Sequence, residues 1–157
     1  MRALSALLVC IVAIGARPAS GQGQHTPDWT RQQLPTWVVR RLADSGFAER
    51  YRIATTLNPY FQAGDFDGDG RGDVAVLIIE QATGKQGVAI FRRASRTPDI
   101  LGAGTTFGHG GDDFHWLGIW RIEPRGRIDD LYLEAPEAAS AVVRWTGTRF
   151  TWLQRAD

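Results

Sequence analysis

Four aspartates crowd one short, glycine-containing stretch of this chain, and their spacing limits how the residues around them can fold. Asp65, Asp67 and Asp69 alternate with single residues, and Asp73 closes the run. Carboxylates this close together repel one another unless a cation lies among them. A hard cation such as Ca²⁺ takes about six to eight oxygen ligands and favours carboxylates and carbonyls. The stretch therefore predicts a calcium loop.

The residues after the loop predict a strand and not a helix. Residues 74–79 are a continuous apolar segment, rich in valine and isoleucine, which is typical of a buried strand. An EF-hand loop has a glutamate at its twelfth position, where this chain has Val76, and the flanking residues are not helical in pattern. We therefore expect the metal to lie at the start of a buried strand.

Residues 64–77 resemble the calcium loop of FG-GAP or VCBS-type repeats, which occur in integrin alpha-subunit propellers and in many bacterial secreted proteins. The matching residues are Gly-Asp-Phe-Asp-Gly-Asp-Gly-Arg-Gly-Asp-Val-Ala-Val-Leu. The resemblance implies that Asp65, Asp67, Asp69 and Asp73 bind the metal through their side chains and Arg71 through its carbonyl. Propellers need several such repeats, and the sequence has no second one. The resemblance therefore implies a calcium loop without a complete propeller.

The C-terminal half carries a second resemblance. Residues 101–104, 110–116 and 139–145 are similar to segments of a group of small bacterial exported proteins that carry one such loop. That group supplies no activity. The resemblance therefore implies export and calcium binding, and no reaction.

The N-terminus has the order of a secretory signal peptide over residues 1–21. Arg2 precedes the apolar stretch 3–16, and small residues suited to cleavage follow at 19–21. The apolar stretch is shorter than the roughly 20 residues of a membrane-spanning helix. We expect a flexible leader over 22–30 and one calcium-loop domain over 31–157, secreted or periplasmic.

The charge and the cysteine content limit which partners we expect and whether disulfide bonds can form. The formal net charge is +1 and there is no long basic run, so nucleic acid and anionic membranes are not expected partners. The single cysteine, Cys10, lies in the expected signal peptide, which leaves no disulfide in the exported chain. An envelope protein or a polysaccharide is the expected partner.

The pattern of apolar residues predicts an α+β domain rich in β-structure. A helix begins near Pro35, and Gly46 is a plausible end. A final hairpin with its turn at residues 147–148 places Trp145 opposite Phe150. The expected strands cover 51–57, 74–79, 88–92, 100–101, 114–122, 128–133, 141–145 and 150–153. We expect the helix to pack on a mainly antiparallel sheet of about six or seven strands.

A segment with two histidines and two aspartates offers candidate ligand-binding residues. His109, Asp112, Asp113 and His115, with the neighbouring Trp116, can bind zinc or pair a histidine with an aspartate for acid–base chemistry. A glycine-rich turn with an aspartate cap is the structural alternative. The sequence also leaves two roles for the tryptophans, because their rings either fill a core or stack on sugars or a peptide.

Two functional hypotheses follow from these patterns. The first is an exported, calcium-stabilised, non-enzymatic binding or structural module of the cell envelope or exterior. The second is an envelope hydrolase that uses the loop from His109 to His115. The first requires only the acidic loop, whereas the second requires a catalytic arrangement that the sequence does not display.

Overall fold

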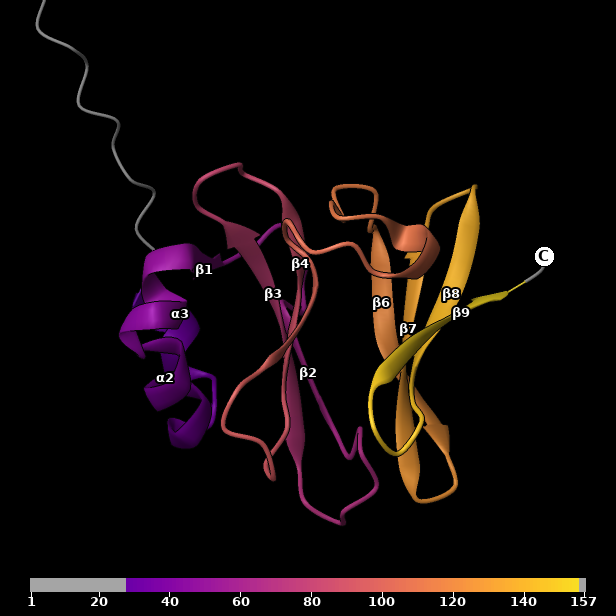
Figure 1. Ribbon diagram of the computed structural model, residues 1–157, viewed down its shortest axis with the longest axis horizontal. Helices are drawn as coiled ribbons and strands as arrows, with labels where there is room; N and C mark the ends of the chain where they lie inside the picture. Colours follow the sequence, from indigo (N-terminus) through magenta and orange to yellow (C-terminus); the bar gives the residue numbers. More distant parts are fainter. Residues whose placement is uncertain (1–27, 156–157) are drawn as a thin grey trace, which may run out of the picture.

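The computed structural model describes residues 28–155, so the expected signal peptide and the leader as far as residue 27 lie outside the described residues. Within 28–155 the chain forms three short α-helices followed by nine strands in two sheets, with one 3₁₀ helix between them (Figure 1). In this range none of the helices has the length and apolar character needed to cross a bilayer.

The helices come first in the described chain: α1 (Asp28–Gln32), α2 (Thr36–Leu42) and α3 (Ser45–Arg50). Pro35 precedes α2, where its fixed φ suits a helix start. Val38 and Leu42, one turn apart, are the buried residues of α2. Asp44 caps α3 by accepting a hydrogen bond from the Gly46 N–H at 3.1 Å. Gly46 therefore lies in the first turn of a further helix and does not end the first one.

The first sheet is built around one fully buried strand, β3 (Asp73–Glu80). Along one edge it pairs with β1 (Tyr51–Ile53) and then with β2 (Phe61–Gly64), and along the other with β4 (Gln86–Phe91), beyond which lies β5 (Asp99–Gly102). Figure 1 shows the helices on one side of this sheet and the second sheet on the other. Because β3 is covered on both faces, its apolar run is continuous and does not alternate.

The second sheet is an antiparallel meander of β6 (Ile119–Arg125), β7 (Ile128–Ala135), β8 (Ala139–Trp145) and β9 (Phe150–Arg155). Its last hairpin pairs Trp145 with Phe150 and Val143 with Trp152, which confirms the register predicted from the sequence. Leu131, Leu133 and Val143 are buried in the core that the sheets share.

Two hydrogen bonds and a cation–π contact join the two sheets. The Trp120 indole N–H donates to the Pro59 carbonyl at 2.7 Å, and the Gln62 amide donates to the Trp120 carbonyl at 3.2 Å. At another point the Arg92 guanidinium lies over the Trp145 ring, 4.2 Å from its centroid. These contacts fix how β2 and β4 of the first sheet sit against β6 and β8 of the second.

The predicted α+β class with mainly antiparallel pairing is confirmed, but the strands divide differently from the prediction. In residues 28–155 there are five strands in one sheet and four in the other, not six or seven in one. The strand expected over 114–122 begins only at Ile119. Phe114 and Leu117 are buried, but the segment that contains them is irregular and forms no strand. Strand β2 was not anticipated. A second sheet is required because both faces of β3 are apolar.

Candidate functional site

The acidic run forms the hairpin loop between β2 and β3. Gly64, the last residue of β2, pairs with Asp73, the first residue of β3, and residues 65–72 close the loop between them. Asp65 and Asp73 therefore stand at the two ends of the loop. The prediction of a loop that leads directly into a buried strand is confirmed.

Three of the four loop aspartates converge on one point. Asp65, Asp67 and Asp73 each offer a carboxylate oxygen, and these oxygens all lie within 4.8 Å of one another. Ligand oxygens lie about 2.3–2.6 Å from Ca²⁺, so oxygens on opposite sides of the ion are about 5 Å apart. The spacing therefore allows the three carboxylates to share one metal ion.

Asp73 is the one buried member of this trio. It is 0% exposed, and its two oxygens accept hydrogen bonds from the N–H groups of Arg93 at 2.6 Å and Phe66 at 3.1 Å. Burial raises the pKa of Asp73 to about 6; these hydrogen bonds oppose the rise and the nearby Asp67 and Asp69 add to it. A cation between the carboxylates would relieve this cost.

The loop backbone curls around Asp65. Its two carboxylate oxygens accept hydrogen bonds from the N–H groups of Gly68 and Gly70, each at 2.8 Å. Gly68 has a φ of 77°, and a Cβ atom there would lie 2.6 Å from Cγ1 of Ile128. Only glycine satisfies both conditions, so the loop shape is fixed by its own sequence and by its contact with β7.

Asp69 and Arg71 lie apart from the trio and pair with each other. The Asp69 carboxylate accepts hydrogen bonds from the Arg71 backbone N–H at 2.8 Å and from its Nε at 3.1 Å. The Arg71 side chain is 61% exposed. The structure thus brings together three of the four predicted aspartate ligands and leaves Asp69 at the rim.

Two residues outside the loop hold it in place, and neither was anticipated. The Asp129 carboxylate of β7 accepts a hydrogen bond from the Asp65 N–H at 2.9 Å, and its own N–H donates to the Asp65 carbonyl at 2.8 Å. Arg92 pairs with Asp67 at 3.4 Å and with Asp99 at 2.9 Å. These partners are distant in the sequence, and no local pattern marks them.

The histidine and aspartate segment does not assemble into one centre in the described chain. Asp112 forms an ion pair with Lys85. One oxygen of Asp113 accepts a hydrogen bond from the Gln86 N–H at 3.0 Å and shares another with the His115 ring at 2.5 Å. Burial disfavours the ionised form of Asp113, but these bonds outweigh it and lower its pKa. The two aspartates therefore tie the segment to the start of β4.

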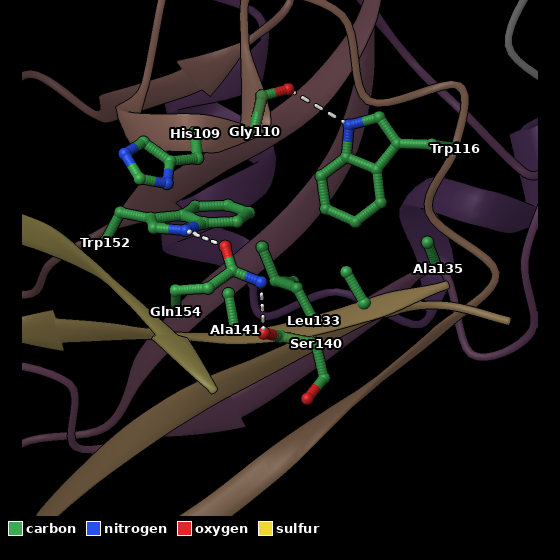
Figure 2. Close-up of a pocket in the computed structure, with 10 residues that line it drawn as sticks. His109, Gly110, Trp116, Leu133, Ala135, Ser140, Ala141, Trp152 and Gln154 are labelled. Atoms are coloured by element: carbon green, nitrogen blue, oxygen red, sulfur yellow. Dashed lines mark hydrogen bonds between the residues drawn. The ribbon is translucent and has the colours of Figure 1, made fainter. Parts of the chain in front are cut away.

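His109 and Trp116 instead line a pocket on the second sheet (Figure 2). The pocket has a volume of about 230 Å³ and is lined by His109, Gly110, Trp116, Leu133, Ala135, Ala139, Ser140, Ala141, Trp152 and Gln154. It lies at the Ala135 end of β7, whereas the acidic loop touches that strand at Asp129. The two candidate sites are thus at opposite ends of one strand.

Two further pocket residues are Trp152, one of the tryptophans whose role the sequence left open, and Gln154, which the sequence did not single out. The Trp152 indole N–H donates to Oε1 of Gln154 at 3.0 Å, and the Gln154 amide donates to the Ser140 carbonyl at 3.0 Å. Their spacing in β9 places both on one face of the sheet. The alternation of side chains along β9 indicates that these two residues share a face, but it does not show which face of the sheet is left partly uncovered.

Comparison with known proteins adds no assignment to this geometry. Neither protein-family models, nor curated proteins, nor solved structures gave a match to the chain. The arguments about function therefore rest on the residues and contacts described above.

Proposed function

We propose that this chain is an exported, non-enzymatic module of the bacterial cell envelope or exterior that calcium stabilises. The observation that carries the proposal is the convergence of Asp65 and Asp67 on the fully buried Asp73. A buried carboxylate beside two others is costly unless a cation compensates it. Calcium is the cation that suits an all-oxygen site of this charge and spacing.

The calcium would act on structure, because of what the loop connects. It joins β2 to the central strand β3 and contacts β7 of the second sheet through Asp129 and Ile128. A metal held there fixes the junction between the two sheets. A crowded site of several carboxylates also has little capacity to polarise a substrate, in contrast to an open zinc site.

The hydrolase alternative would require His109, Asp112, Asp113 and His115 to act together. Within the part of the chain that the structure describes, Asp112 pairs with Lys85, Asp113 with His115, and His109 faces the pocket. The Asp113–His115 pair is an arrangement that acid–base chemistry could use, but neither residue lines the pocket that holds His109. We therefore propose a binding role, with an envelope protein or a polysaccharide as partner.

Thermal unfolding of the exported chain with calcium and with a chelator tests the calcium proposal. A ligand that binds only the folded state stabilises it by mass action. For a Kd of about 10⁻⁴ to 10⁻³ M, ~10 mM calcium contributes about 1.5 to 2.7 kcal/mol. We expect the midpoint to rise by about 4 to 14 °C.

Two variants show whether the loop is responsible. Asp67→Asn removes one of the converging carboxylates and is expected to abolish the shift. Asp112→Asn removes an aspartate that pairs with Lys85 outside the loop, and its shift is expected to equal that of the parent protein. Identical melting curves with calcium and with chelator would refute the proposal.

A further inference from the structure

The pocket beside Trp116 and Trp152 has features of a small-ligand site that the calcium loop does not explain. It opens to solvent and has room for about seven or eight waters at ~30 Å³ each, given its volume of about 230 Å³. Pockets for drug-sized ligands are larger, about 300 Å³ or more. The space therefore suits one six-membered ring with its substituents.

Two indole rings form a corner at this pocket. Trp116 and Trp152 stand almost perpendicular, at 82°, with their ring centroids 5.9 Å apart. The Trp116 indole N–H donates to the Gly110 carbonyl at 3.0 Å, and the Trp152 indole N–H donates to the Gln154 side chain. Both rings are therefore fixed by hydrogen bonds within the protein, and what they offer a ligand is ring surface.

Small residues create the space around that corner. Ala135 and Ala139 face each other across β7 and β8, and Ala141 follows on the same face of the sheet. On the other side of Trp152, a Cβ atom at Gly108 or Gly110 would lie within 2.6 Å of the Trp152 side chain. Figure 2 shows His109 and Gly110 on one side of the Trp152 ring and Ala141 and Leu133 on the other.

The lining residues indicate the charge of the ligand. None of the ten is an aspartate, glutamate, lysine or arginine, so a charged ligand would have no counter-charge in the wall. The wall is still not purely apolar, because Ser140 and Gln154 are among its lining residues, as is His109. A neutral ligand with both an apolar face and hydroxyl groups matches this combination.

We propose that this pocket binds one neutral sugar unit of a polysaccharide, with the pyranose ring against an indole. The negative face of an indole attracts the C–H groups on one face of a pyranose. The ring hydroxyls then reach Gln154 at the edge of the pocket. This inference rests on the binding role proposed above and not on the calcium loop, which lies at the other end of β7.

NMR titration of the ¹⁵N-labelled exported chain in calcium-containing buffer tests the inference. The probes are free glucose, galactose, mannose and N-acetylglucosamine, with tetramethylammonium chloride as a cationic probe of compact size. At least one sugar is expected to shift the indole N–H signals of Trp116 and Trp152 saturably, with a Kd on the order of 1 mM for a ligand this small. The indole signal of Trp29, which is 50% exposed in α1, is the internal control.

Two matched variants locate the binding. Ala139→Phe fills the pocket from an exposed position, whereas Ala138→Phe adds the same bulk at the neighbouring exposed residue, which does not line the pocket. We expect the first to weaken binding at least tenfold and the second to leave it unchanged. Gln154→Leu, which keeps the bulk and removes the polar edge, is expected to weaken sugar binding as well.

The results separate this inference from the calcium proposal. A saturable sugar response with no calcium-dependent melting shift would support the pocket and refute the metal. The absence of a saturable response to any of the four sugars would overturn the inference, as would equal binding by Ala139→Phe and Ala138→Phe. A response to tetramethylammonium alone would also overturn it, because it would assign a cation to the pocket.

Discussion

Replacing Asp129 with alanine tests whether the second sheet holds the acidic loop in place. The Asp129 carboxylate accepts the Asp65 N–H at 2.9 Å, and it packs so closely that a Cβ atom at Gly64 would lie 2.8 Å from its Oδ2. In Asp129→Ala the Asp65 N–H loses this partner. The backbone bond from the Asp129 N–H to the Asp65 carbonyl remains available.

The expected cost follows from the type of hydrogen bond that is lost. A partly buried donor left without its charged acceptor costs about 1 to 3 kcal/mol. For a domain of this size, 1 kcal/mol corresponds to about 3 to 5 °C in the unfolding midpoint. We therefore expect Asp129→Ala to lower the midpoint by about 3 to 15 °C and to weaken calcium binding, because Asp65 is no longer held.

Asp129→Asn is the matched control, since it keeps an acceptor oxygen and removes only the charge. Its midpoint is expected to fall by less than half as much as that of the alanine variant. Urea and thermal unfolding followed by tryptophan fluorescence measure both. If Asp129→Ala is as stable as the parent protein, the contact does not hold the loop. If both variants lose equal stability, charge and not the hydrogen bond is responsible.

Two further predictions concern the loop. Since burial raises the pKa of Asp73 to about 6, this group makes the metal-free protein less stable as pH rises through about 6. Calcium must displace a proton below that pH, so its apparent affinity is expected to be about tenfold weaker near pH 5 than near pH 7.5. Equal calcium-dependent midpoint shifts at both pH values would contradict this. Gly68→Ala is expected to cost about 1 to 3 kcal/mol in urea unfolding, because of its positive φ and its contact with Ile128. Gly72→Ala, with open space around it, is the near-neutral control.

Local patterns were sufficient where neighbouring residues decide the structure. The last hairpin was predicted in its correct register because one alignment brings its large apolar residues, among them Trp145 and Phe150, onto paired positions. The strand that became β3 was predicted from its unbroken apolar run. Prediction of the segment before β6 was wrong, since apolar residues such as Phe114 and Leu117 are buried there without forming a strand.

The sequence alone determined that an acidic, glycine-containing loop leads into a buried strand, because charge repulsion and glycine conformation act between neighbouring residues. Only the tertiary structure decided that Asp69 pairs with Arg71 instead of joining Asp65, Asp67 and Asp73. It likewise decided that Asp129 holds the loop and that Trp116 meets Trp152 at a pocket. The contacts of Asp129 with Asp65 and of Trp116 with Trp152 join residues far apart in the chain, and they form only once the second sheet packs against the first. No local pattern in a single sequence encodes such a pairing.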